Sequence, residues 1–577
     1  MSSLGGLYIG VSGLNVSQAA LNITSHNLAN VDTKGFVRQQ AVLTDFNYIT
    51  WGSSHSSSMQ QGLGVDFATV KQVRDSFLDK AYRQEIGREA FYESQYTAVG
   101  EVEGLFGELE GEAFQDTLSE FWTSLQELSK EPDSVVARAS LIQTAVTFVE
   151  RAENISTQLN DYQVNLNTQI KDQVNRINEI GENVKQLNLK IRQYESTGVE
   201  HANDLRDQRN SLLDELGKIV NITYKENTVG IVTVNVEGVP FVTEDTAFKM
   251  DAIRISETSE MLKPVWVSHG NADVFNLDKA PSSLNNNDIG SLKGLLSARG
   301  YKQANYTDIP NRDNYESDAL YNSAVIDYNN KINSSVIMSV QAQFDQLIHG
   351  IVTTVNDILS PNKEVTLTDG TKVKILDEEN APVGMDDNKT MGEALFNRKS
   401  MDRYSEAQEI DIINESGGYE TITARVYNVE DPTDNYSLFT LGEIEINENI
   451  LQNYSFIPLS SNTGTGDFDV KTAEKLLSEW QKPFATLSPN TLTKNNFSDY
   501  YNSFISEIAN RGEQLKTIST NQASMVESID NQRMAVTGVS SDEELTNLIK
   551  YQHAYNASAR YVNVVSEMLE HIITKLS

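Results

Sequence analysis

The chain has 577 residues, a formal net charge of −35 and no cysteine. Its 81 acidic residues against 46 basic ones give a surface of the wrong sign for binding nucleic acid or acidic lipids. The lack of cysteine excludes disulfides, thiolate metal sites and cysteine nucleophiles, and the length predicts several domains.

The N-terminal segment carries apolar residues three and four positions apart, which predicts a helix with a coiled-coil seam. Gly5, Gly6, Gly10 and Gly13 weaken that helix, because each helical glycine costs roughly 1 kcal/mol relative to alanine. We therefore expect the segment to fold only when it packs against the other end of the chain or against the ends of other copies. The alternative is an ordinary terminal helix docked on its own core.

Residues 1–33 contain no lysine or arginine. A secretory signal peptide needs a basic first region, and a helix that lies on a membrane surface needs basic residues along its polar face, so neither is expected. No apolar run approaches the roughly 20 residues that span a bilayer. No membrane contact is therefore predicted.

Helical periodicity dominates the next part of the chain. Residues 36–78 are short and turn-rich and predict loop and strand, whereas 77–96 and 114–128 have helical spacing. Residues 148–194 keep a heptad rhythm over more than six repeats, which predicts a long rod-like helix. A charged amphipathic helix is predicted over 204–213.

Beyond residue 216 the pattern changes to short alternating segments typical of strands. Asp369-Gly370 between two such segments predicts a hairpin. Residues 300–335 show no assignable period, and 497–533 predict another long helix.

The C-terminal segment repeats the three-and-four spacing of the N-terminal one. Ser541 and Glu544 predict a capping box in which Ser541 caps the helix and Glu544 reaches back to it. The two segments together predict an assembly seam formed by Leu4, Leu7, Val11, Leu14, Leu21, Leu28, Leu545, Leu548, Tyr555, Ala559, Val562, Leu569, Ile573 and Leu576.

The predicted fold class is multidomain and mainly α, with terminal coiled-coil helices and a long helical rod domain that carries inserted β-rich outer domains. The predicted domains are paired terminal helices at 1–45 and 540–577, a helical rod domain at 46–225, 290–360 and 480–539, a β-rich insertion at 226–289 and a β-rich variable outer domain at 361–479.

A short motif follows the N-terminal seam: Ala29-Asn30-Val31-Asp32-Thr33-Lys34-Gly35-Phe36. It resembles the signature of bacterial flagellar rod, hook and hook-associated axial proteins, with Asn30, Thr33, Gly35 and Phe36 as its signature residues. The segments 538–545 and 548–559 are similar to the C-terminus of the hook-associated members.

This resemblance implies a structural subunit at the junction between the hook and the filament of the flagellum, outside the cell. The implied partners are identical subunits in a ring, the hook protein, and a second junction protein on the filament side. Export would proceed unfolded through the flagellar type III apparatus, after a cytoplasmic stage in which a chaperone holds the C-terminal helix.

Asn30, Gly35 and Phe36 are expected to form the turn that leaves the N-terminal helix, since Asn and Gly tolerate positive φ and Phe36 offers an apolar anchor. A helix C-cap without any interface role explains the same residues equally well.

The sequence predicts no enzyme, cofactor or metal site. The histidines are scattered, without metal-ligand spacing, at His26, His55, His201, His269, His349, His553 and His571. No phosphate-binding loop occurs, and Gly62-Leu63-Gly64 lacks the third glycine of a dinucleotide fingerprint. Asp386-Asp387-Asn388 lacks the spaced ligands of a calcium loop.

Two alternatives to the junction subunit remain open. One is a surface-displayed binding module or adhesin, in which the acidic β regions recognise a ligand and the rod displays them. The other is the hook protein itself, against which the long heptad segment and the C-terminal similarity argue.

Overall fold

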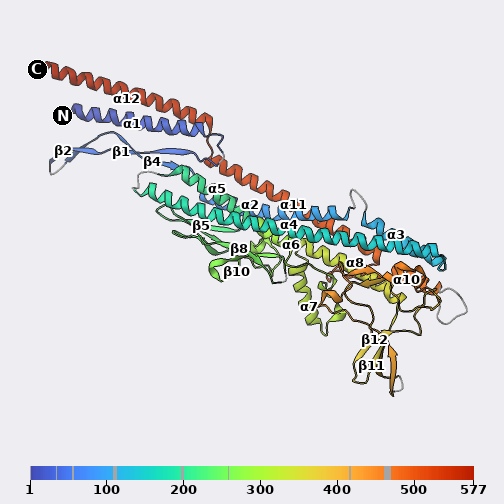
Figure 1. Cartoon of the computed structure of the whole chain (residues 1–577). Helices are drawn as coiled ribbons and strands as arrows, with labels where there is room; N and C mark the ends of the chain where they lie inside the picture. Colours follow the sequence, from blue (N-terminus) through green and yellow to red (C-terminus); the bar gives the residue numbers. More distant parts are fainter. Residues whose placement is uncertain are drawn as a thin grey trace.

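The computed structural model describes residues 2–33, 35–54, 57–107, 113–196, 201–257, 259–414, 417–460 and 470–576. The molecule is elongated, and its two chain ends lie side by side at one end (Figure 1). Long helices run through the body, and small β-sheets lie along one side and at the far end (Figure 1). The predicted fold class, mainly α with β-rich insertions, is confirmed.

The narrow end is built from both termini. Helix α1 (Ser2–Ala29) runs antiparallel to α12 (Ser541–Leu576) (Figure 1). Beside α1 lies a β-ribbon, in which β1 (Gln39–Asp45) pairs with β4 (Val65–Gln72) and β2 (Tyr48–Ser54) pairs with β3 (Ser57–Gly62). Helix α1 is thus held between α12 and the ribbon.

The helical body consists of α2 (Ser76–Phe106), α3 (Phe114–Lys130), α4 (Val135–Glu195), α5 (Asn203–Ile219), α6 (Ser291–Arg299), α8 (Val336–Leu359), α10 (Val470–Trp480) and α11 (Phe497–Thr537). The rod helix α4 has 61 residues, which is about 90 Å at 1.5 Å per residue. Its buried face includes Ile155, Ile170, Ile177 and Val184, as its heptad rhythm predicts.

An aromatic cluster forms the centre of this body. The Phe114 ring lies 5.7 Å from Phe148 and 5.1 Å from Phe344, measured between centroids. The Trp480 ring lies 5.8 Å from Phe121. Trp480 belongs to α10, so the last part of the range predicted as β-rich, 361–479, is helical and packs into the body. The amphipathic pattern of α10 is short, which is why the sequence did not separate it from its β surroundings.

Two small sheets lie against α4 (Figure 1). One has the order β5-β6-β7 and the other β10-β9-β8, and all of their pairs are antiparallel. Their strands are β5 (Ile222–Glu226), β6 (Val232–Val236), β7 (Val239–Val242), β8 (Met250–Arg254), β9 (Leu262–Trp266) and β10 (Ala272–Asp273).

The far end carries a four-stranded sheet of order β12-β11-β14-β15 and a pair formed by β13 and β16. These strands are β11 (Asn362–Leu367), β12 (Lys372–Leu376), β13 (Phe396–Arg398), β14 (Gln408–Ile413), β15 (Tyr419–Ala424) and β16 (Ile444–Ile446), and the short helix α9 (Glu448–Gln452) follows. Gly370 has φ +87° in the turn between β11 and β12, where the Asp-Gly pair predicts a hairpin. Residues 300–335, which had no assignable period, contain α7 (Asp318–Asp327) and one π-helical turn at Tyr328–Ile332.

Helix asparagines fasten the strands to the helices. In each case the side-chain amide donates to the carbonyl of a strand or near-strand residue and accepts a backbone N–H there, so that the amide takes the place of a neighbouring strand. On α4, Asn188 does this with Val232 and Asn178 does it with Met250. Asn167 spans Glu260 and Leu262 in the same way. We call these contacts asparagine clamps.

The clamps extend beyond α4. Asn356 of α8 holds Phe396 of β13, with hydrogen bonds of 2.8 and 3.1 Å. Asn27 of α1 holds Gln39 of β1, with hydrogen bonds of 2.8 and 3.0 Å. One device therefore attaches strands in the terminal end, the middle and the outer end of the molecule.

We predict that Asn356→Asp destabilises the protein by at least about 2 kcal/mol, because the carboxylate loses the donor and places a buried charge against the Phe396 carbonyl. Thermal unfolding followed by circular dichroism measures the effect. Asn175→Asp makes the same chemical change on the exposed face of α4 and is expected to leave the melting temperature nearly unchanged. Equal melting temperatures for the two variants would contradict the clamp.

Candidate assembly surface

Small residues bring α1 and α12 together. A Cβ added at Gly10 would lie 2.6 Å from Cγ2 of Val562, and one added at Gly13 would lie 2.7 Å from Oγ of Ser558. Real Cβ atoms do not approach that closely, so the glycines that weaken α1 as an isolated helix permit its contact with α12. Packing of α1 against α12 compensates for the helical stability that the glycines cost α1.

Some of the predicted seam residues are half-buried, and others are exposed to solvent. Half-buried are Leu7, Leu14, Leu21, Leu28, Leu548, Ala559, Val562 and Leu569, whereas Val11, Leu545, Tyr555 and Ile573 are exposed. Leu4 and Leu576 belong to α1 and α12, but their side chains lie outside the described residues. On α12 the positions that meet the α1 glycines are Ser558, Tyr561, Val562 and Val565, so the contact is turned slightly from the predicted register.

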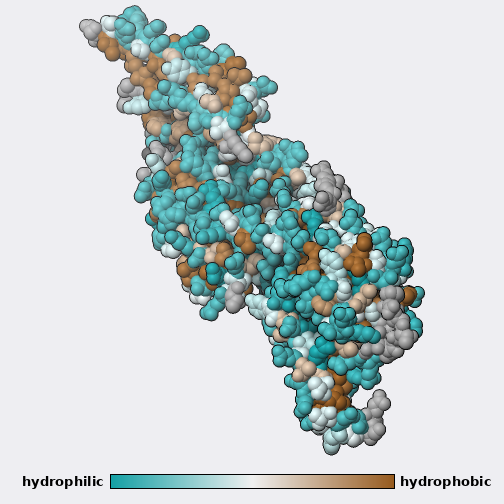
Figure 2. Space-filling view, turned by 45° about the vertical axis from the view of Figure 1, so that its right-hand side comes forward, coloured by the Kyte–Doolittle hydropathy of each residue, from teal (hydrophilic) through white to brown (hydrophobic). Residues whose placement is uncertain are grey.

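A second row of apolar side chains on α12 stays exposed in the described part of the chain. Val564, Met568 and Ile572 follow helical spacing and are 47%, 59% and 47% exposed. We call this row the outer stripe. Figure 2 shows apolar side chains gathered on the narrow end, where α1 and α12 lie. An exposed apolar face of this kind marks an interaction surface.

The signature residues form the turn after α1. The Asn30 side chain donates to the His26 carbonyl at 2.9 Å and accepts the Thr33 hydroxyl at 3.1 Å. Gly35 has φ +81°, which favours glycine. The Phe36 ring lies edge-on to His26, with 5.4 Å between the ring centroids. Their role in assembly stays a prediction.

A polar knot joins the end of α1 to the start of α12. The Glu544 carboxylate is buried and accepts hydrogen bonds from Arg38 at 2.9 Å and from Asn27 at 3.2 Å. The predicted capping box is therefore wrong. Ser540 supplies the capping oxygen, with the Glu543 N–H at 3.4 Å, and Glu544 turns away to Arg38 instead of reaching back. Tertiary partners have overridden the local pattern.

Behind this knot a chain of ion pairs connects α2, α5 and α11. Asp79 pairs with Arg74 and, at 3.1 Å, with Arg533. Arg533 continues at 2.6 Å to Asp214, which also pairs with Arg83 at 2.6 Å. These side chains are largely buried, so each charge depends on its neighbours for solvation. The network fixes the point where the terminal helix pair meets the body.

Asp207 of α5 touches the same region. Its carboxylate accepts the Val37 N–H at 3.2 Å and the Gln72 amide at 2.8 Å, and it lies 3.8 Å from Arg74. Burial raises the pKa of Asp207 to about 6, although these hydrogen bonds and the arginine oppose the change. The segment after the signature turn thus depends on a carboxyl group that titrates in mildly acidic solution.

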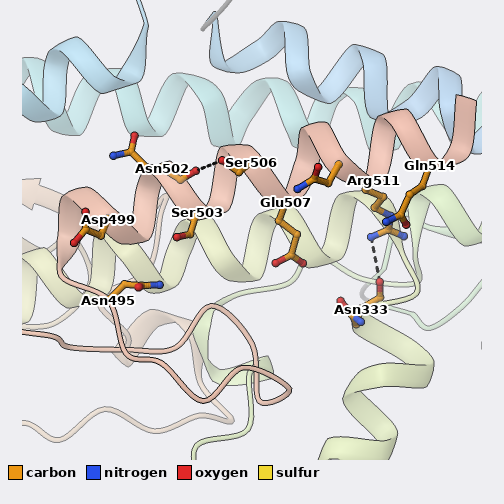
Figure 3. Close-up of a pocket in the computed structure, with 10 residues that line it drawn as sticks. Asn333, Asn495, Asp499, Asn502, Ser503, Ser506, Glu507, Arg511 and Gln514 are labelled. Atoms are coloured by element: carbon orange, nitrogen blue, oxygen red, sulfur yellow. Dashed lines mark hydrogen bonds between the residues drawn. The ribbon is translucent and has the colours of Figure 1, made fainter.

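A polar groove of about 880 Å³ runs along α11 (Figure 3). Arg511 donates to the carbonyls of Asn333 at 3.1 Å and Ser334 at 2.8 Å, which ties the turn before α8 to α11. The Ser506 hydroxyl donates its hydrogen bond to the Asn502 carbonyl and not to a side chain that could act as a general base (Figure 3). The hydrogen bonds of these groove residues therefore stabilise the fold.

Two of the titratable groups singled out in the sequence, His349 and Asp386, have structural partners, whereas His55 lies outside the described residues. His349 pairs with Glu430 at 3.2 Å and stacks on Tyr306. Burial raises the pKa of Glu430 and the His349 contact lowers it, with a net fall to about 2. Asp386 accepts the Thr390 hydroxyl at 2.7 Å. Over the described ranges, no cluster of three or more metal-ligating side chains forms, and no helix is long and apolar enough to cross a membrane.

Comparison with known proteins places this architecture. Residues 99–372 match the family model for the helical domain of the flagellar hook-associated protein FlgK. Residues 7–36 match the model for flagella basal body rod proteins, and 530–575 match the C-terminal model of the basal body rod proteins FlgEFG. Flagellar hook-associated protein 1 of Bacillus subtilis is 25% identical over 99% of this chain and 98% of its own length. The chain belongs to the flagellar hook-associated protein 1 family.

Other members support the same placement. The hook-associated protein 1 of Salmonella typhimurium is 25% identical, and the alignment covers 98% of each chain. The solved structure of the flagellar hook junction protein FlgK from Burkholderia pseudomallei shares the fold with a TM-score of 0.50 at 12% identity, over 79% of this chain and all of that one. The two rod-protein matches fall on α1 with its turn and on the end of α11 with α12, where the polar knot lies.

Sequence reasoning missed the residues that hold this knot. Arg38 lies 506 residues before Glu544, and Glu544 carries only the local signal of a capping box. Arg38 and Asp207 follow no recognised spacing, so only the folded chain brings them together. For Asn27 a usable signal exists, since a polar residue interrupts the buried face of α1 there.

We predict that Glu544→Gln weakens the knot by about 2 kcal/mol, because Arg38 keeps its charge while its buried partner loses one. Amide hydrogen exchange in the first turns of α12 should become faster. Glu543→Gln is the matched control, since Glu543 pairs with the same arginine but is 61% exposed, and its effect should stay below about 1 kcal/mol. Similar exchange rates in both variants would rule out a special role for Glu544.

We predict a pH dependence from Asp207. Its folded pKa of about 6 exceeds its usual value of 3.8, so the native state binds the proton more tightly than the unfolded chain. The stabilisation by the protonated Asp207 carboxyl is complete at pH values below the pKa of this group in the unfolded chain. It is lost as the pH rises through the pKa of this group in the folded protein. Between about pH 4 and about pH 6.5 the free energy of unfolding of the wild type should therefore fall by about 2 kcal/mol relative to that of Asp207→Asn.

Urea unfolding at a series of pH values measures this difference. Asp204→Asn on the same helix provides the control, since the Asp204 side chain is 69% exposed. A difference between wild type and Asp207→Asn that does not vary with pH would show that the Asp207 carboxyl keeps its ordinary pKa.

Proposed function

We propose that this chain is a structural subunit of the bacterial flagellum at the junction between the hook and the filament. The observation that carries the proposal is the terminal helix pair, in which α1 and α12 satisfy each other on one side while the outer stripe of α12 stays apolar and exposed. A subunit of a continuous tube needs a surface of this kind for its neighbours. The full-length similarity to hook-associated proteins 1 supports the same role.

In this proposal the segments of the chain lie at different distances from the axis of the tube. Residues 1–45 and 540–577 line the inner tube, and a helical domain of 46–225, 290–360 and 480–539 surrounds them. The β-rich regions 226–289 and 361–460 face outward, whereas α10 packs into the helical body and stays with it. The position of both chain ends at one tip and of the β11–β12 hairpin toward the other supports this order (Figure 1).

The proposed partners follow from that position. Identical subunits form a ring through the seam and the outer stripe, the hook protein contacts one side, and a second junction protein contacts the filament side. An export chaperone covers the C-terminal helix in the cytoplasm, because Met568 and Ile572 would otherwise expose apolar surface before assembly. The subunit carries load and catalyses no reaction.

The two alternatives are less well supported. A free-standing adhesin would not require the terminal helices and their turn, yet similarity extends over the whole length of hook-associated proteins, termini included. The hook protein is disfavoured because residues 99–372 match the helical domain of FlgK.

We predict that Met568→Glu abolishes incorporation into the junction, because a charge in the outer stripe cannot be desolvated between subunits. The monomer should fold normally, since Met568 is 59% exposed. Motility and the presence of the subunit in isolated hook–filament structures are the measurements, in cells that produce only the variant.

Asn563→Glu adds the same charge to an exposed polar position of α12 and should assemble normally. Leu569→Glu, in the half-buried part of the helix pair, should also prevent assembly while the body stays folded. Normal hook–filament joining by Met568→Glu would refute the outer stripe as a contact between subunits.

A further inference from the structure

A cavity of about 770 Å³ lies between the β10-β9-β8 sheet and the body, away from the terminal helices. Strand β9 and the segment after β10 form one wall, and α6 with the turn before α8 forms the other. Its volume falls within the range of about 300–1,000 Å³ that is typical of small-molecule sites. Neither the helix pair nor the polar knot contributes to it.

Lys293 of α6 is the unusual residue of this cavity. The side chain lines the cavity although the residue is only 5% exposed. Among the described residues, its ammonium group forms neither a hydrogen bond nor an ion pair, and its one assigned contact is with the Phe275 ring, 6.0 Å from the centroid. A buried lysine without a partner is costly, so its presence calls for an anion.

Two carboxylates act on Lys293 electrostatically, but neither forms an ion pair with it. Burial lowers the pKa of Lys293, while Glu237 and Asp288 raise it without forming an ion pair with it. Asp288 is already engaged by Arg88 at 3.3 Å and by Tyr92 at 2.9 Å. The hydrogen-bonding capacity of the ammonium group is therefore unused.

The cavity is also basic in a strongly acidic protein. Five of its lining side chains are basic and three are acidic, whereas the whole chain carries a net charge of −35. The basic residues are Lys263, Lys279, Lys293, Arg299 and Lys331. Such a local reversal of charge favours entry of an anion.

The rest of the wall is apolar. Val239, Val274, Phe275 and Leu296 line the cavity beside Lys293. We propose that this cavity binds a compact organic anion, with its carboxylate hydrogen-bonded to Lys293 and its apolar body against Phe275 and Leu296. An ammonium group at one end and apolar walls along the sides match an amphipathic carboxylate and disfavour a strongly hydrated inorganic anion.

Isothermal titration of the full-length monomer with 2-naphthoate tests the proposal, and the uncharged 2-naphthamide serves as the matched ligand control. We expect saturable binding of one naphthoate per chain and much weaker binding of the amide. Lys293→Met keeps the aliphatic stem and removes the charge, so naphthoate affinity should fall about tenfold or more. Lys249→Met, at an exposed position outside the cavity, should leave the affinity unchanged.

A second variant keeps the test independent of the lysine. Ile255→Trp, at a half-buried wall position, fills the cavity without touching the charge and should also weaken naphthoate binding. Absence of saturable naphthoate binding to wild type overturns the proposal. Equal affinity of wild type and folded Lys293→Met, or equal binding of naphthoate and naphthamide, overturns it as well. If Lys293→Met does not fold, loss of binding in Ile255→Trp together with discrimination against the amide supports the site, and retained binding refutes it.

Discussion

The architecture depends on asparagine side chains that act as short pieces of β-strand. A strand laid against a helix exposes backbone groups that the helix, with its own groups already paired, cannot satisfy. The clamps solve this problem, because the amide of Asn167, Asn178 or Asn188 supplies one donor and one acceptor at the required spacing. A chain of small, separate sheets can therefore be mounted along α4 without a continuous β-core.

The terminal end uses the opposite principle. Instead of specific polar partners, α1 offers glycines, and the pair forms because the two backbones come close. Close approach gives a thin helix pair with few buried apolar side chains, and among the described side chains of α12 Val565 is the buried apolar one. Such a pair is weak alone and gains from every neighbour that covers its exposed face. The clamp of Asn27 and the Glu544 knot then set its direction relative to the body.

The sequence could predict a structural feature where the residues that form it are close together in sequence. The rod of α4, the Asp369-Gly370 hairpin and the two terminal helices carry periodic or local signals, and they are present. Glu544 also carries a local signal, the capping box, but Arg38 competes for its carboxylate from more than 500 residues away in sequence. The clamps escaped notice because an asparagine on a helix is ordinarily solvated, and only tertiary structure places a strand beside it. Lys293 escaped for the same reason.

The β11–β12 turn and the chain ends occupy opposite parts of the elongated molecule (Figure 1). Gly370 in this turn would meet no other atom within 4 Å if it carried a Cβ. Foreign residues placed there would add length to an exposed loop, which costs little and leaves the terminal helices untouched. The hairpin is therefore a natural point for displaying a peptide epitope on an assembled appendage.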